Sequence, residues 1–395
     1  MPSLLRVGRP HWLNRSRVRA YAKTTLVLYL LVAGAFVLYR WKSADPGKLF
    51  IASDLAVFWI AGGFARAGHA ALAYDPIRIQ AAMAQWAPQI QGGYGWFYPP
   101  TFLVAVLPMG YLSYAAAYLS FMTATGAGYF WVVRTLAPEA PAGWALVAFP
   151  GLWINVLTGQ NGLLTATLAA AALQAYERRP LVAGLVAGLL VIKPHLALLF
   201  PVAMLAARSW QAFLGAAISA GALVGLGTAV LGSDTWAAWQ HGLGTARALM
   251  EAGGTAPMMP TAFSFLRLLQ APVSAAYAAQ AASTLAAIAA VWRVWQSEAP
   301  FALKAATLMT ASLLATPYLF EYDLAWLGPA LAWAAPVAQR QGWRRGEREI
   351  FLAAWALPIL AVLVAVLVRV QVGPWVVAAL LAMLVTRALE GKGGR

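Results

Sequence analysis

Apolar runs long enough to cross a lipid bilayer recur along this chain, and they constrain its fold more than any other feature. From Leu26 to Ala388 such runs follow one another with only short polar breaks. The chain is 62% hydrophobic and 10% charged, whereas soluble domains carry about 25% charged residues. A water-soluble fold could not hide so much apolar surface. The sequence therefore predicts an all-α integral membrane protein, because a helix of about 20 apolar residues crosses the bilayer with its backbone satisfied.

The apolar runs predict a single polytopic membrane domain over residues 1–395, with about 12 spans and a range of roughly 10 to 13. The predicted helices lie at 24–40, 111–134, 143–157, 161–176, 180–192, 195–207, 211–231, 272–292, 301–315, 324–338, 350–368 and 375–388. Several of these runs are shorter than about 17 residues, so we expect some helices to be tilted, broken or re-entrant.

The basic residues predict which side of the membrane each loop faces. The formal net charge is +15, and membrane proteins concentrate arginine and lysine in cytoplasmic loops. With the N-terminus inside, the inner segments carry Arg6, Arg9, Arg15, Arg17, Arg19, Lys23, Arg134, Arg178, Arg179, Arg208, Arg293, Arg340, Arg344, Arg345, Arg348, Arg387, Lys392 and Arg395. We therefore expect a plasma (inner) membrane protein with cytoplasmic tails at 1–23 and 389–395 and outer segments at 41–110 and 232–270.

Residue types that the sequence lacks limit its chemistry. There is no cysteine, which excludes disulfides and thiolate metal sites. The histidines at positions 11, 69, 195 and 241 have no metal-ligand spacing, and no glycine-rich phosphate loop is evident. The basic start, residues 1–23, lacks the early apolar core and cleavage site of a signal peptide. We therefore expect no metal, no cofactor, no nucleic-acid partner and a retained first span.

The first outer segment, 41–110, is too long for a simple connector and predicts two short helices lying in the membrane interface. Ser53 or Asp54 can cap the first helix, which would stop at Gly68, and Asp75 can cap the second. Asp54 is therefore open to two interpretations, a helix cap and a catalytic base. The two are compatible only in part, because a capping carboxylate is hydrogen-bonded in its charged form and is a weaker base.

Two polar turns at span ends fall on the same outer face under this topology. Gly159-Gln160-Asn161 offers amides at the start of a span, although Asn161 could simply cap that span. Lys193-Pro194-His195 lies where proline breaks a helix. Lys193 is either a snorkelling lysine or a phosphate ligand, and His195 can donate a hydrogen bond beside it.

A third turn, Glu321-Tyr322-Asp323, places two carboxylates between apolar stretches at the mouth of a span. These carboxylates could cap the span, pair with an arginine of the outer segments, or bind substrate. The arginines available for pairing are Arg247, Arg267 and Arg369.

The order of these clusters resembles the membrane glycosyltransferases of family 87. The resemblance rests on five short motifs and on Arg178-Arg179-Pro180-Leu181 before the Lys-Pro span, and it covers roughly residues 50 to 335. The five motifs are Ser53-Asp54, Tyr98-Pro99-Pro100, Gly159-Gln160-Asn161, Lys193-Pro194 and Thr316-Pro317. The late turn departs from the family pattern, because members often carry histidine there and this chain has Glu321 and Asp323.

The resemblance implies a GT-C-like helical bundle that uses a sugar on a polyprenyl phosphate, often mannose. The acceptor is then a glycolipid or growing glycan on the outer side, and the acidic residue of the first outer loop, Asp54, is the candidate base. Because of the departure in the late turn, Glu321 or Asp323 would replace the missing histidine, or His195 would supply the imidazole.

These features predict a metal-independent, inverting hexosyltransferase. Asp54, with Glu321 or Asp323, would carry the acid–base chemistry. The predicted ligands of the donor phosphate are Lys193, His195, Arg247 and Arg267, and the predicted substrate-binding residues are Tyr98, Gln160, Asn161 and Tyr322. The competing hypotheses are a secondary transporter, a protein that translocates lipid-linked glycans, and a lipid-binding scaffold. Transporters place ionisable residues near the bilayer midplane, whereas the predicted spans here carry almost none.

Overall fold

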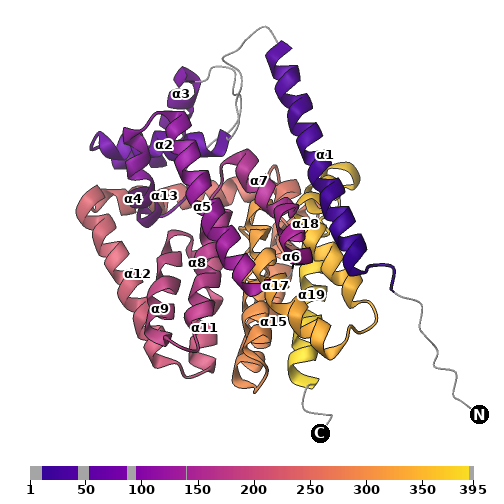
Figure 1. Cartoon of the computed structure of the whole chain (residues 1–395). Helices are drawn as coiled ribbons and strands as arrows, with labels where there is room; N and C mark the ends of the chain where they lie inside the picture. The colour runs from indigo at the N-terminus through magenta and orange to yellow at the C-terminus, as the bar shows by residue number, and fades with distance from the viewer. Residues whose placement is uncertain (1–10, 43–52, 87–94, 139, 391–395) are drawn as a thin grey trace, which may run out of the picture.

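A computed structural model describes residues 11–42, 53–86, 95–138 and 140–390, and these residues form helices with no strand among them. Arg6, Arg9, Lys392 and Arg395 lie outside the described residues. Figure 1 shows the start of α1 and the end of α19 at one end of the molecule, with α2, α3 and α13 at the other.

Within the described residues, five helices are long and apolar enough to cross a membrane. They are α1 (Arg15–Lys42), α12 (Trp210–Leu231), α15 (Val273–Gln296), α18 (Glu347–Val368) and α19 (Gly373–Glu390). The last four agree with spans expected from the sequence. Helix α1 begins at Arg15 instead of near residue 24, because Asn14 caps it by accepting a hydrogen bond from the amide of Arg17 at 3.0 Å. The predicted tail 1–23 is therefore helical from Arg15 onward.

Two of the helices expected from the sequence are interrupted: the one expected at 143–157 breaks before Pro150, and the one expected at 195–207 breaks at Leu198. Besides α5 (Tyr114–Leu136), which is continuous over 23 residues, the remaining apolar helices are short. They are α4 (Pro100–Val106), α6 (Ala140–Val147), α7 (Pro150–Thr158), α8 (Gly162–Ala175), α9 (Pro180–Gly188), α10 (Pro194–Ala197), α11 (Leu199–Ala206), α16 (Phe301–Ser312) and α17 (Leu327–Gln341), with short 3-10 turns η3 (Leu107–Tyr111), η4 (Leu189–Ile192) and η6 (Glu321–Trp326). Pro150 and Pro194 each stand first in a new helix, where their missing amide hydrogen leaves no bond unmade. These breaks are what bring polar turns into an otherwise apolar bundle.

The described part of segment 41–110, which the sequence predicts to face outward, folds into α2 (Ser53–Arg66), η2 (Ala70–Tyr74) and α3 (Pro76–Trp86) before α4. Two predicted helix boundaries in it are confirmed. Gly68 follows α2 with a left-handed φ of 77°, and Asp75 accepts a hydrogen bond from the amide of Ile77 at 2.8 Å. Asp54 lies in the first turn of α2, where a carboxylate is stabilised by the helix dipole.

The second outer segment, 232–270, differs from the expected loop. It forms α13 (Asp234–Glu251), η5 (Ala256–Met258) and α14 (Ala262–Leu268). Helix α13 mixes Asp234, His241 and Arg247 with apolar residues, so a search for apolar runs passes over it. It is an amphipathic helix whose buried residues include Ala246 and Met250.

Two hydrophobic clusters organise the packing. The larger is built mainly from α8, α11 and α15 to α19 and includes Trp326, which is fully buried. The smaller is centred on α2, α4 and the first half of α5, with Phe58 in edge-on contact with Trp96 and Phe102. The two clusters meet where α4 and α8 approach η4, and the polar turns lie along this boundary.

The end of the bundle that carries both described termini is rich in basic residues. Arg387 of α19 is buried and donates to Glu347 of α18 at 2.6 Å. Arg344 pairs with Glu390 at 2.7 Å, and Arg15 donates to Gln339 at 3.3 Å. The α17–α18 turn and the ends of α1 and α19 are thus held together on the face that the positive-inside rule predicts to be cytoplasmic.

Candidate active site

The turn between α7 and α8 is the centre of the candidate site. Gly159 ends α7 in a left-handed conformation, with φ 74°, and its amide bonds to the carbonyl of Asn155 at 2.8 Å. A side chain at Gly162 would overlap the carbonyl oxygen of Tyr322, so glycine permits the close approach of α8 to η6. Asn155 donates to the same carbonyl at 2.8 Å. The turn is therefore pinned against the Glu321–Asp323 segment.

Gln160 joins this turn to the first outer segment. Its Nε2 donates to Oδ2 of Asp54 at 2.9 Å, although the residues are 106 positions apart. Its Oε1 accepts from the hydroxyl of Tyr98 at 2.9 Å and from the amide of Asn161 at 3.3 Å. Gln160 is only 6% exposed. Residues from three separate segments thus meet at one amide group.

Asn161 connects the turn to a buried ion pair. Its Oδ1 accepts from Nζ of Lys193 at 3.2 Å, and the same Nζ lies 2.5 Å from Oδ1 of Asp323. Asn161 stands at the cap position of α8, but its side chain makes no capping hydrogen bond. The rings of Tyr322 and Tyr98 face the Lys193 ammonium, at 4.6 and 5.6 Å from their centroids. Lys193 is thus enclosed and is not a snorkelling lysine.

Asp323 is fully buried, and both of its oxygens are used. Oδ1 meets Lys193, and Oδ2 accepts from the amide of Phe320 at 3.2 Å. It pairs with Lys193 and with none of the arginines that the sequence suggested. A carboxylate held in this way fixes the position of η6.

Glu321 occupies a different environment from its neighbour. Its Oε2 is buried and has no hydrogen-bond partner among the described residues. Burial raises the pKa of Glu321 to about 8, and the negative charges of Asp54 and Asp323 add to that rise while Lys193 opposes it. A carboxyl with this pKa is mostly protonated at pH 7 and can then donate a hydrogen bond.

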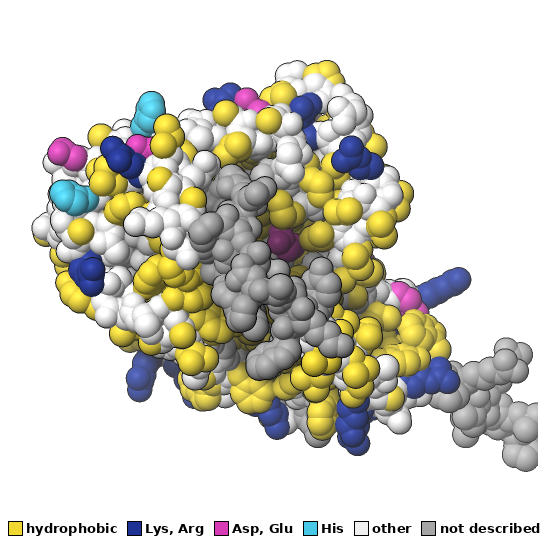
Figure 2. Space-filling view, turned by 90° about the horizontal axis from the view of Figure 1, so that it is seen from above, with side chains coloured by type: hydrophobic (Ala, Val, Ile, Leu, Met, Phe, Trp, Pro, Cys, Tyr) yellow, Lys and Arg dark blue, Asp and Glu magenta, His cyan; other side chains and the backbone are white. Residues whose placement is uncertain are grey.

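The face that carries α2 and α13 has a recess with an acidic side chain at its bottom, flanked by hydrophobic side chains (Figure 2). Among the carboxylates of the cluster, Asp54 and Glu321 are only partly buried, whereas Asp323 has no exposed surface. Of the three, Asp54 and Glu321 are therefore the carboxylates with surface left for a substrate to contact.

His195 lies beside the cluster on α10. Its Nε2 is buried without a hydrogen-bond partner among the described residues, and its ring meets Tyr318 edge-on at 5.7 Å. Tyr318 in turn meets Phe320, which stacks on Tyr322 at 5.5 Å. The imidazole is thus joined to the site by a row of aromatic rings.

Arg247 and Arg267 lie apart from this cluster, on α13 and α14. Arg247 pairs with Glu251 at 2.7 Å. Arg267 donates to the carbonyl of Glu251 at 3.0 Å and to that of Ala271 at 2.5 Å. Neither guanidinium contacts Lys193, Glu321 or Asp323 in the part of the chain that the structure describes.

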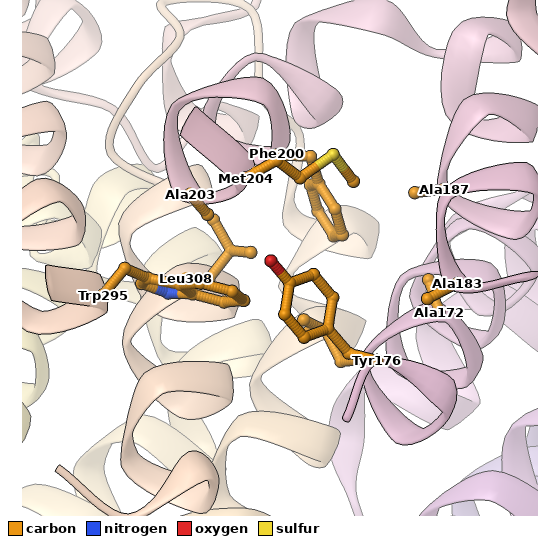
Figure 3. A pocket seen from close by; sticks show the side chains of 10 residues that line it. Ala172, Tyr176, Ala183, Ala187, Phe200, Ala203, Met204, Trp295 and Leu308 are labelled. Atoms are coloured by element: carbon orange, nitrogen blue, oxygen red, sulfur yellow. The ribbon is translucent and has the colours of Figure 1, made fainter. Parts of the chain in front are cut away.

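A small cavity lies elsewhere among the described helices. This cavity, between α8, α9, α11, α15 and α16 and shown in Figure 3, has a volume of about 10 Å³ and an apolar lining that includes Tyr176, Phe200 and Trp295. That volume suits one water molecule at most. In the described ranges, no three His, Asp or Glu side chains gather in a way that could hold a metal ion.

Sequence reasoning did not single out Asn155 or Gly162, which pin the turn to η6. An asparagine inside an apolar span was the available signal for the first, because a buried amide in lipid needs a specific partner. Its partner, a backbone carbonyl of a distant segment, has no counterpart in local sequence.

Comparison with known proteins identifies the family of the chain. The model of glycosyltransferase family 87 matches residues 96–317, which is more than half of the chain and includes Tyr98, Gln160, Asn161 and Lys193. Asp54, Glu321 and Asp323 lie outside the matched range, but the hydrogen bonds described above join Asp54 and Asp323 to it. Searches of curated proteins and of solved structures give no match. The chain belongs to glycosyltransferase family 87, and it is a membrane glycosyltransferase.

Proposed function

We propose that the chain transfers a hexose, with mannose as the first candidate, from a polyprenyl-phosphate donor to a glycolipid or glycan acceptor. One observation carries the proposal. Asp54, Lys193 and the Glu321–Asp323 segment come from distant parts of the chain and converge on the α7–α8 turn. The family supplies the reaction class, which requires a sugar donor and an acceptor, and a GT-C type fold is consistent with it.

Asp54 serves as the general base in this proposal. As the acceptor hydroxyl attacks the anomeric carbon, its proton passes to the Asp54 carboxylate. A bond forms between the acceptor oxygen and the anomeric carbon, and the bond from that carbon to the phosphate oxygen breaks. Attack opposite the departing phosphate inverts the configuration. The lipid phosphate leaves with the electron pair as an anion, so one base suffices.

The departing phosphate needs stabilisation of its charge more than it needs a proton. Glu321, mostly protonated at pH 7, can donate a hydrogen bond to a phosphate oxygen without repelling it. His195 has an unpartnered ring nitrogen next to the cluster and can donate a second hydrogen bond. Lys193 acts from behind Asp323, where it balances the charge of the carboxylate and holds η6 in place. No metal is required by this scheme.

A donor anchored in the membrane suits the position of the site. A polyprenyl tail remains among the lipid chains, so its phosphate lies at the interface. The five long apolar helices provide the membrane domain, and shorter helices broken at prolines would complete about 12 crossings. We place the site at the outer face of the plasma membrane with both termini in the cytoplasm, because arginines gather at the opposite end of the bundle.

The test replaces Asp54 with Asn and measures transfer of labelled mannose from polyprenyl-phosphate mannose to a glycolipid extract in detergent. Asp75→Asn is the matched control, because Asp75 lies in the same outer segment and asparagine keeps its capping role. We expect Asp54→Asn to lose at least about 100-fold in rate and Asp75→Asn to keep wild-type turnover. Full activity in a folded Asp54→Asn protein would remove Asp54 from the mechanism. Solute uptake into vesicles, without any glycolipid product, would favour a transporter instead.

A further inference from the structure

The hydrogen bonds of Gln160 determine which way its side-chain amide faces. Its carbonyl oxygen accepts from the Tyr98 hydroxyl at 2.9 Å and from the Asn161 amide at 3.3 Å. A tyrosine hydroxyl can also accept, but a backbone amide only donates. The oxygen of the Gln160 amide must therefore face Asn161, and its nitrogen must face Asp54, at 2.9 Å.

This arrangement does not suit a substrate ligand. An amide that binds a sugar hydroxyl needs an acceptor or donor turned toward the substrate. In Gln160 both lone pairs of the oxygen are used, and one of the two N–H groups is given to Asp54. The residue is also only 6% exposed, which leaves little of its surface for a substrate to contact.

We propose that Gln160 is a positioning residue that aims the Asp54 carboxylate and stabilises its ionised form, and that Tyr98 locks Gln160 in the required orientation. This inference rests on the proposed function, in which Asp54 is the base. It changes the role of both residues, because the sequence suggested that Tyr98 and Gln160 bind substrate.

The location of Gln160 gives this role a reason. Asp54 is carried by α2 in the smaller hydrophobic cluster, whereas η6 packs in the larger one. The hydrogen bond from Gln160 crosses the boundary between them. Loss of this bond would remove a direct contact that holds the base across the boundary, and so would loosen its position relative to η6.

A titration tests the proposal without any turnover. Infrared spectra of the full chain in detergent would follow the Asp54 carboxyl, whose band is assigned by its loss in Asp54→Asn. We expect Gln160→Ala to move the titration midpoint of that band upward by about one pH unit, because a hydrogen bond to the charged form is lost. Gln160→Glu should move it further, since it adds a like charge. An unchanged midpoint in Gln160→Ala would overturn the proposal.

Gln280 supplies a matched control. It is 3% exposed, accepts from the amide of Phe263 at 3.3 Å and donates to the carbonyl of Leu314 at 2.9 Å. Gln280→Ala therefore removes a buried glutamine with similar bonds elsewhere in the bundle. We expect it to leave the Asp54 midpoint unchanged, and an equal shift in this variant would show that the effect is general and refute the positioning role.

Kinetics with polyprenyl-phosphate mannose separate positioning from substrate binding. We expect Gln160→Ala to lower kcat by about tenfold or more, with the KM values of donor and acceptor within about twofold. A raised KM at constant kcat would instead make Gln160 a substrate ligand.

Tyr98→Phe serves as a second variant if Gln160→Ala does not fold. It removes only the hydroxyl, and the titration midpoint of Asp54 must then shift in the same direction by a smaller amount. A shifted midpoint together with a wild-type protein that transfers no mannose would refute the proposed donor and leave the positioning role intact.

Discussion

Nζ of Lys193 lies 2.5 Å from Oδ1 of Asp323, although 130 residues separate them in sequence. Both side chains are buried, with 2% and 0% of their surface exposed. The ammonium also donates to Asn161, and Asp323 also accepts from the backbone of Phe320. This pair joins the start of α10 to η6 and so fixes the position of the Glu321–Asp323 segment in the site. Removing one charge from such a pair leaves the other buried and unpaired.

Lys193→Met should therefore destabilise the fold by about 3 to 5 kcal/mol as well as impair transfer. Thermal unfolding in detergent, followed by circular dichroism, measures the loss. The double variant Lys193→Met with Asp323→Leu should recover much of the stability, since no unpaired charge remains. We expect no recovery of activity in the double variant. Wild-type stability in Lys193→Met would contradict the enclosed ion pair, and restored activity in the double variant would leave the pair without a role in catalysis.

The rate of transfer should fall as the pH rises through about 8, the pKa of Glu321. Above this pH the ionised carboxylate can no longer donate to the departing phosphate and repels it. Glu321→Gln stays neutral and keeps a donor, so it should remain active at pH 7 and lose this alkaline fall. Glu321→Ala should be impaired at every pH. An inactive but folded Glu321→Gln would show that Glu321 acts as a base.

Glu321 also makes folding stability depend on pH. Its pKa is raised in the folded protein, from 4.5 to about 8, so the unfolded chain releases the proton first as the pH rises. Its contribution is fully present below about 4.5 and is lost progressively between that pH and about 8. Unfolding by denaturant across this range should show a decline that Glu321→Gln removes. An identical decline in the variant would assign it to other groups.

Gly162→Ala should separate α8 from η6. A methyl group there would overlap the Tyr322 carbonyl and the Asn155 side chain, which should destabilise the fold by about 1 to 3 kcal/mol. Gly126→Ala is the control, because Gly126 lies in α5 and a methyl group added there would meet nothing within 4 Å, while alanine favours the helix. Thermal unfolding and transfer activity measure both variants. Equal stability in the two would contradict the close approach.

The predicted sidedness can be tested cleanly because the chain contains no cysteine. Ser233→Cys reports the end that carries α13, and Arg345→Cys reports the basic end; both positions are exposed. With a membrane-impermeant maleimide on intact cells, we expect labelling at position 233 only. Position 345 should react once the membrane is permeabilised. The reverse pattern would place the site in the cytoplasm.

The positions of most helices could be predicted from the sequence, because the features that start and end a helix are local in sequence. Apolar length and Pro194 predicted where helices start and stop, and the structure agrees at Pro194. The helix expected at 143–157 is interrupted, because Pro150 begins a new helix. Helix α13 was missed because its apolar residues lie on one face among charged ones. The start of α1 was missed because a basic helix extends past the apolar run. Both errors arise from treating hydropathy as the only sign of a helix.

The sequence predicted most of the residues that lie in the site, but it did not predict which of them contact one another. The order of motifs drew attention to Asp54, Gln160 and Lys193, which the structure brings together. Spacing along the chain carries no information about which distant carboxylate meets Lys193, so the pairing with Asp323 did not follow. Arg247 was a reasonable phosphate ligand by charge alone, but its guanidinium is engaged by Glu251.

Gln160 and Asn161 are adjacent in sequence yet serve different carboxylates, the first by contacting Asp54 and the second through Lys193 to Asp323. A displacement of this one short turn would therefore disturb both halves of the site together. Substitutions on the Asp54 side and on the Asp323 side should consequently show non-additive effects, even though the two carboxylates belong to separate hydrophobic clusters.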